Sequence, residues 1–118
     1  MNLDIVKNKL IPEIQSFRPD LIIISAGFDA HEDDPLAQMR VSSDCYGKMT
    51  SLILKTAKEV CNGRLMSMLE GGYNLEALSH CVTEHLKVLK DDTWTVFVSP
   101  LLEKLTVCGL NSNCIPPP

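Results

Sequence analysis

The segment Leu21-Ile-Ile-Ile-Ser-Ala-Gly-Phe-Asp29 combines a continuous apolar run with a glycine and a carboxylate. An uninterrupted run rich in β-branched residues, here Leu21–Ile24, is typical of a strand buried on both faces of a parallel sheet. The same arrangement returns further along the chain, where the apolar run Leu65–Leu69 precedes Glu70-Gly-Gly-Tyr-Asn74. The two segments predict two strands, each followed by a loop with glycine and one chemically reactive side chain.

The N-terminal residues have the spacing of an amphipathic helix. Apolar side chains recur there at steps of three and four, at Leu3, Val6, Leu10, Ile14 and Phe17. Pro12 lacks the N–H that an interior turn needs, so it either kinks this helix or opens a second, short one. Arg18-Pro19-Asp20 is expected to end the helical segment.

Two further helices are predicted around the second strand. One runs from Asp44 to Cys61, begins after an N-cap at Ser42 or Ser43, and ends before Gly63. Its expected inward residues are Tyr46, Met49, Ile53, Ala57 and Val60. The other begins after a cap at Asn74 and places inward Leu75, Leu78, Val82, Leu86 and Leu89.

The predicted order is therefore helix, strand, helix, strand, helix, which indicates an α/β fold with a parallel sheet flanked by helices. The carboxyl ends of parallel strands lie at one edge of a sheet, and ligands bind beyond that edge. Asp29 and Tyr73 follow the two strand ends. We therefore expect them on the same side of the molecule, where a site for a ligand can form.

Composition limits the classes of function. A chain of 118 residues with 45% hydrophobic content can form one core, so we expect one domain or part of a larger one. The net charge of −4 offers no electrostatic surface for nucleic acid, and no apolar run is long enough for a membrane span or a signal peptide. The cysteine count of 5, without a Cys-x-x-Cys pair, favours idle thiols over disulfides. These features predict a cytoplasmic or nuclear protein.

The two loops together resemble one enzyme family. Ser25-Ala-Gly-Phe-Asp29, Asp33-Asp34-Pro35-Leu36 and Glu70-Gly-Gly-Tyr-Asn-Leu75 resemble the zinc-dependent deacetylases, which comprise histone deacetylases, acetylpolyamine amidohydrolases and acetoin-utilisation proteins. The resemblance is closer to the class II-like branch and extends from residue 2 to residue 90. It implies the arginase/deacetylase-like fold, with three layers, of which this chain would be an incomplete, C-terminal part.

The resemblance also implies roles for individual residues. Asp29 would be a Zn²⁺ ligand, Tyr73 would polarise the amide carbonyl of the substrate, and Leu36 would line the substrate tunnel. Gly71 and Gly72 would allow the substrate to approach the backbone closely. Local sequence leaves other interpretations open, since an Asp after a strand often caps a turn and a Tyr at a strand end often leaves its hydroxyl in water.

The sequence around the histidines does not indicate a functional role for them. His31 forms an Asp-x-His pair with Asp29, but the resemblance places the ligand histidine of the family in another segment. We therefore expect His31 to be an exposed loop residue beside three acidic residues. His80 and His85 lie in the third predicted helix, where we expect a surface or partly buried pair.

The family's other zinc ligands lie before the part that matches, so we expect the C-terminal portion of a deacetylase that is inactive as an isolated chain. Its complete form would act on acetylated lysine or acetylpolyamine. Residues 1–90 would be the deacetylase part. Residues 91–118 would be a divergent, partly disordered tail, with a short strand at 93–98, a turn of helix at 101–105 and an extended end at 115–118.

Two alternatives stay open. One is a non-catalytic module that docks on a protein partner through an exposed sheet edge. The other is a small free-standing α/β enzyme that uses Asp29, His31 and Tyr73 by themselves.

Overall fold

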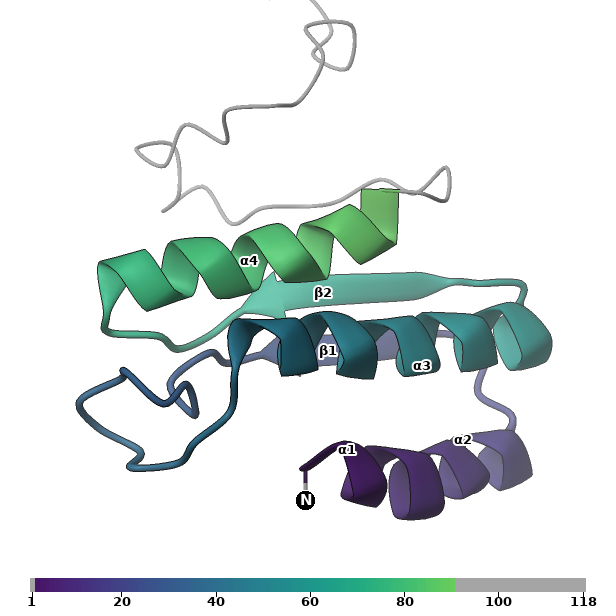
Figure 1. The fold of residues 1–118 in the computed structure, drawn as a ribbon. Coiled ribbons are helices and arrows are strands. Elements are labelled where there is room, and N and C mark those ends of the chain that lie inside the picture. The colour runs from purple at the N-terminus through teal and green to yellow at the C-terminus, as the bar shows by residue number, and fades with distance from the viewer. Residues whose placement is uncertain (1, 91–118) are drawn as a thin grey trace, which may run out of the picture.

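The computed structural model describes residues 2–90, and its helices and strands follow the predicted order (Figure 1). An N-terminal helical segment contains α1 (Asn2–Ile5), the π-helical turn η1 (Val6–Leu10) and α2 (Ile11–Phe17). It leads into β1 (Ile22–Ala26), α3 (Ser43–Cys61), β2 (Leu65–Leu69) and α4 (Leu75–Lys90). The predictions for the tail lie outside the described residues.

Pro12 opens a second helix. It lies in the first turn of α2, and in the turn before it the Ile11 N–H donates to the carbonyl of Val6, five residues back. Because proline has no N–H to continue an α-helical ladder, the preceding turn widens. The segment ends at Arg18, which has a left-handed φ of 51° and donates its N–H to Ile14 O at 2.9 Å. The predicted stop at this position is confirmed.

The two strands pair in parallel, from Ile22 opposite Leu65 to Ala26 opposite Leu69. β2 has the predicted bounds, whereas β1 starts one residue later than predicted and continues to Ala26. Helices α3 and α4 pack on each other and on one face of this sheet, and α2 packs against α3 (Figure 1). The core contains aromatic, aliphatic and thiol side chains from the end of β1, the loop after it and both long helices: Ala26, Phe28, Val41, Tyr46, Leu78 and Cys81.

Helix α3 is capped as its sequence predicts. The Ser42 side chain accepts a hydrogen bond from Cys45 N, and the helix ends at Asn62 and Gly63, both with left-handed φ. Its inward face differs from the predicted one, because Met49, Ile53 and Val60 are only half-buried. Tyr46 and Ala57 are buried as predicted, and the other buried residues of the helix are Gly47, Thr50, Leu54, Thr56 and Cys61. The threonines tolerate burial since each hydroxyl donates to the carbonyl one turn earlier.

Helix α4 begins at the predicted cap. The Asn74 side-chain oxygen accepts hydrogen bonds from Glu76 N and Ala77 N, each at 3.1 Å. Leu75 was predicted to face inward but is 75% exposed. The first turn of α4 extends past the end of β2 (Figure 1), which leaves this side chain mostly exposed.

His85 is a core residue, and the prediction of a surface or partly buried position is wrong for it. Its Nδ1 lies 2.6 Å from Thr50 Oγ1, and its Nε2 lies 2.8 Å from Ser67 Oγ. Because the Thr50 hydroxyl donates its proton to Tyr46 O, it accepts from Nδ1–H, and Nε2 accepts from Ser67. Burial lowers the pKa of His85 to about 4, so the ring is neutral at neutral pH. His80 is exposed, as predicted.

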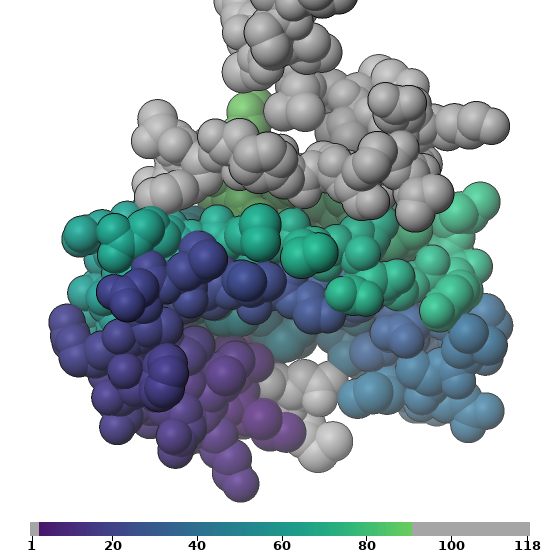
Figure 2. All heavy atoms as spheres, turned by 180° about the vertical axis from the view of Figure 1, so that it is seen from behind, coloured from purple at the N-terminus to yellow at the C-terminus, as the bar shows by residue number. Residues whose placement is uncertain are grey.

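The second face of the sheet is uncovered within residues 2–90, and the prediction that β1 is buried on both faces is wrong for this chain. Leu21, Ile23 and Met68 are 50%, 56% and 50% exposed, on the face opposite α3 and α4. Figure 2 shows the two strands side by side at the surface on this side. We refer to these three residues as the outer sheet face. Parallel sheets normally have both faces covered, so the fold is incomplete as described.

Two compositional expectations can be compared with the described residues. Cys45, Cys61 and Cys81 are free thiols, in agreement with the prediction against disulfides for this part of the chain. Between residues 2 and 90 there is no helix with the length and apolarity needed to cross a bilayer.

Candidate functional site

The loops that follow β1 and β2 lie against each other at the carboxyl edge of the sheet. Phe28 N donates to Gly71 O at 2.8 Å, and Glu70 N donates to Ala26 O at 3.1 Å. These backbone bonds continue the strand pairing past the strand ends. They bring Asp29 and the Gly71–Tyr73 turn to one edge of the molecule, where the sequence predicts a site.

The Asp29 carboxylate lies in a space bounded by two glycines. A Cβ atom at Gly27 would lie 3.4 Å from Asp29 Oδ1, and one at Gly71 would lie 3.4 Å from Asp29 Cγ. No group among residues 2–90 donates a hydrogen bond to this carboxylate. Asp29 therefore does not cap a turn or a helix in the described structure, and both of its oxygens are available to a ligand.

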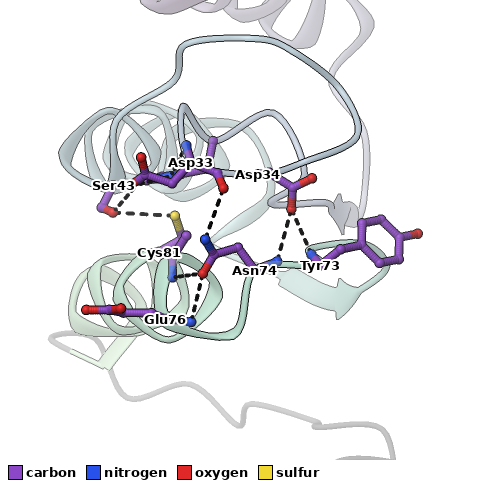
Figure 3. Close-up of polar contacts among 9 residues, drawn as sticks. Asp33, Asp34, Ser43, Tyr73, Asn74, Glu76 and Cys81 are labelled. Atoms are coloured by element: carbon purple, nitrogen blue, oxygen red, sulfur yellow. Dashed lines mark hydrogen bonds and ion pairs between the residues drawn. The ribbon is translucent and has the colours of Figure 1, made fainter.

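Tyr73 is fixed by its backbone and free at its side chain. Its N–H donates to Asp34 Oδ2 at 2.7 Å, whereas its side chain is 59% exposed. In the close-up the ring points away from the neighbouring polar groups (Figure 3). The preceding Gly72 has φ of 140°, and a Cβ atom there would lie 2.7 Å from Leu78 Cδ1. The positive φ favours glycine, and a Cβ atom would also force Leu78 to shift, so the turn before Tyr73 depends on this glycine.

Asp34 connects the two loops, and the sequence does not predict this role. Its side chain is buried, and it accepts hydrogen bonds from the backbone N–H groups of Leu36, Tyr73 and Asn74. Burial opposes ionisation of this carboxyl, but the three hydrogen bonds outweigh it and lower the pKa of Asp34 below its ordinary value. The bond to Leu36, two residues on, is an Asx turn, which the Asp-Pro pair could have indicated. Its hydrogen bonds with Tyr73 and Asn74 join residues 39 and 40 positions apart, so no local sequence pattern indicates them.

Leu36 lies in the same loop with an exposed side chain. It is 62% exposed, and its backbone N–H is held by Asp34 Oδ1 at 3.0 Å. The structure thus places an apolar side chain at the surface of the loop that also carries Asp29.

His31 is buried, and the prediction of an exposed loop position is wrong. Its Nε2 lies 3.0 Å from Ser43 Oγ, and its Nδ1 accepts a hydrogen bond from Asp33 N at 3.1 Å. Nε2 therefore carries the proton and donates to Ser43. Because both ring nitrogens are engaged, His31 does not form a ligand pair with Asp29 in this arrangement. The hydrogen bond from His31 to Ser43 holds the loop after β1 against the start of α3.

The described residues by themselves do not fit a metal centre. Residues 2–90 contain no group of three or more His, Cys, Asp or Glu side chains placed to hold a metal ion. Asp29 offers one carboxylate, whereas zinc sites use three or four protein ligands. A metal at this edge would need further ligands from other residues.

Comparison with known proteins decides the family. The model of the histone deacetylase domain matches residues 2–89. The chain belongs to the histone deacetylase family. This confirms the resemblance seen in the two loops, and it makes the chain part of a family of hydrolases.

Individual deacetylases are similar to a large part of this chain. Type-2 histone deacetylase 2 of Dictyostelium discoideum is 44% identical over 89 residues, which are 73% of this chain and 5% of that protein. Histone deacetylase 14, chloroplastic, of Arabidopsis thaliana is 46% identical over 80 residues, 68% of this chain and 19% of that protein. The chain thus spans a small part of the deacetylases it matches.

A solved deacetylase domain confirms the fold. The crystal structure of the HDA15 HD domain superposes with a TM-score of 0.67 at 36% identity, over 78% of this chain and 25% of that one. The α/β arrangement described above is therefore a fragment of the deacetylase fold.

Proposed function

We propose that this chain is the C-terminal portion of a zinc-dependent deacetylase domain. The complete enzyme would hydrolyse the acetyl amide of lysine in histones or other proteins, or that of a polyamine. The observation that supports the proposal is the Asp29 carboxylate, which accepts no hydrogen bond from residues 2–90 and faces the Gly71 backbone at the edge where Tyr73 emerges. Residues 1–90 would form the deacetylase part and residues 91–118 a divergent tail.

Each residue of the site has a proposed role. Asp29 would be one Zn²⁺ ligand, and zinc, when bound, would act as a Lewis acid on the acetyl carbonyl. The Tyr73 hydroxyl would donate a hydrogen bond to the oxygen on which negative charge develops. Leu36, Gly71 and Gly72 would form the wall along which the acylated side chain enters. The Tyr73 side chain is 59% exposed, and its ring would have to turn toward this wall to meet the substrate.

As an isolated chain the protein would lack activity. One carboxylate does not retain zinc, and the remaining metal ligands and proton-transfer groups would come from the part of the domain that precedes this match. Free thiols suit a reducing compartment, for which we propose the cytoplasm or nucleus.

A graft tests the proposal. Residues 2–89 would replace the matching segment of the HDA15 HD domain, and hydrolysis of an acetyl-lysine peptide would be measured against the unmodified domain. We expect activity that a zinc chelator removes and that Asp29→Ala and Tyr73→Phe each reduce at least ~100-fold. A folded, zinc-loaded graft that is equally active with Tyr73→Phe would refute the role of Tyr73.

One observation favours a second function. The outer sheet face exposes Leu21, Ile23 and Met68, and an uncovered sheet is a surface on which another chain can dock. A non-catalytic module that binds a protein partner through this sheet would explain the exposure. Co-purification of a partner in 1:1 ratio, lost when Ile23 and Met68 are replaced by threonine, would support it.

A further inference from the structure

Asp34 connects the loop after β1 with the turn after β2. It is 7% exposed, and its two oxygens divide their hydrogen bonds between the two segments. Oδ1 accepts from Leu36 N at 3.0 Å in its own loop, while Oδ2 accepts from Tyr73 N at 2.7 Å and from Asn74 N at 3.3 Å. Hydrogen bonds to an ionised carboxylate are stronger than neutral ones, and the shortest of the three is the one to Tyr73.

Asn74 adds a second connection beside the first. Its side-chain nitrogen donates to Asp33 O at 3.0 Å, and its side-chain oxygen caps α4 through Glu76 N and Ala77 N. Figure 3 shows Asn74 between Asp34 and the start of α4, with Tyr73 on the other side of Asn74. The turn is therefore tied to the loop on one side and to the helix on the other.

Tyr73 is held through its main chain and not through a hydrogen bond of its side chain. Its side chain is 59% exposed and has no hydrogen bond to a described residue, so no side-chain contact of this kind fixes it. The strand pairing fixes Gly71, and the conformation of Gly72 fixes the next residue. The Asp34 carboxylate is the group that holds the Tyr73 N–H itself.

An ordinary loop-stabilising role would account for only part of these contacts. An Asx turn needs one oxygen bound to the N–H two residues on, which Oδ1 supplies. The other oxygen reaches across 39 residues to the turn that carries Tyr73. The loop that it leaves also carries Asp29. Asp34 therefore fixes the loop that carries Asp29 relative to the turn that carries Tyr73.

From this geometry we infer that Asp34 is a positioning residue that sets the place of Tyr73 relative to Asp29. The inference rests on the proposed function for its catalytic meaning, whereas the connection itself is a property of this chain. Asp34→Asn is the test variant, because it keeps the size of the side chain and removes its charge and one acceptor. Glu32→Gln is the matched control, since it removes a charge from the same loop at an exposed side chain.

Amide hydrogen exchange in the full 118-residue chain tests the connection. In Asp34→Asn, we expect exchange at Tyr73 N–H and Asn74 N–H to become about 10- to 100-fold faster, while His85 N–H in the interior of α4 keeps its rate. Glu32→Gln should leave all these rates unchanged. Unchanged exchange at Tyr73 in a folded Asp34→Asn chain would overturn the inference.

Kinetics of the HDA15 graft test the catalytic meaning. We expect Asp34→Asn to lower kcat about 10- to 100-fold with KM within about twofold and zinc content retained, measured at a temperature where the variant graft stays folded, which a merely structural role would not produce. If Tyr73→Phe abolishes turnover but Asp34→Asn retains it, the positioning role is wrong and the proposed function stands. If Tyr73→Phe leaves turnover unchanged, the role of Tyr73 is wrong, and a positioning role in catalysis fails with it.

Discussion

At the residue scale, the two glycines before Tyr73 have different constraints. Gly72 has a left-handed φ of 140° and would place a Cβ atom 2.7 Å from Leu78 Cδ1, whereas the nearest atom to a Cβ at Gly71 is Asp29 Cγ at 3.4 Å. Gly72→Ala should lower the free energy of unfolding of the chain by about 1–3 kcal/mol through strain. Gly71→Ala should cost less than about 1 kcal/mol. Urea unfolding of both variants measures this, and equal losses would contradict the assignment.

Tyr46 gives a second residue-scale prediction. Its hydroxyl is buried without a hydrogen-bond partner among the described residues, and burial raises the pKa of Tyr46. Because an unsatisfied buried hydroxyl is destabilising, Tyr46→Phe should raise the free energy of unfolding by about 1 kcal/mol while the ring keeps its packing on Phe28. Tyr73→Phe is the control, since its exposed hydroxyl should change stability by less than ~0.5 kcal/mol. A loss of stability in Tyr46→Phe would show that the hydroxyl has a partner in solution.

At the element scale, His85 joins α3, β2 and α4 through Thr50 and Ser67. Its pKa is lowered to about 4 from 6.5, so between these values the unfolded chain binds a proton that the folded chain does not. The stabilisation is complete above pH 6.5 and is lost as pH falls from 6.5 toward 4. From pH 7 to pH 5 the loss should be about 2 kcal/mol.

Comparison with His85→Gln isolates this contribution from the other histidines. The variant should be less stable at pH 7, but it should lose about 2 kcal/mol less than the parent chain between pH 7 and pH 5. The lowered pKa of Asp34 also favours the folded state, yet its effect is lost only below the ordinary value of 3.8, outside this range. Equal pH dependence in the two chains would contradict a neutral, buried His85.

The sequence predicts elements better than it predicts contacts between them. Helix caps such as Ser42 and Asn74 depend on neighbours within a few residues, so the local pattern was sufficient and both predictions are confirmed. Positions that depend on tertiary contacts were missed. His31 and His85 are buried because hydroxyls of Ser43, Thr50 and Ser67 satisfy their rings, and no spacing rule indicates such partners.

In the candidate site too, the features that depend on local sequence could be predicted and those that depend on tertiary contacts could not. That Asp29 and Tyr73 leave one sheet edge could be predicted from the order of strands and helices. That the Asp29 carboxylate accepts no hydrogen bond from residues 2–90, and that Asp34 holds Tyr73, depends on the approach of two loops that are far apart in sequence. Predicted roles as a metal ligand and a catalytic tyrosine remain proposals, since they require groups beyond the described residues.

At the scale of the whole molecule, the outer sheet face distinguishes the isolated chain from a complete deacetylase domain. The matched part of the chain covers 25% of the HDA15 domain chain, and within residues 2–90 the parallel sheet has one uncovered face. If the remaining part of the domain covers this face, the same substitution will have different effects in the two settings. Ile23→Thr and Met68→Thr suit this comparison because threonine is compatible with a strand.

In the isolated chain, each substitution should change the free energy of unfolding by less than ~0.5 kcal/mol, because Ile23 and Met68 are at least half exposed. In the HDA15 graft, each should lower it by about 1–3 kcal/mol, since burial of an apolar side chain is then lost. Ile24→Thr is the control. Because Ile24 packs against the core in the chain, this substitution should destabilise both the isolated chain and the graft. Calorimetric or urea midpoints of the six variants and their two parent proteins measure this. If Ile23→Thr and Met68→Thr are neutral in the graft as well, the outer face stays uncovered in the complete domain, and docking of a separate partner becomes the better explanation of its exposure.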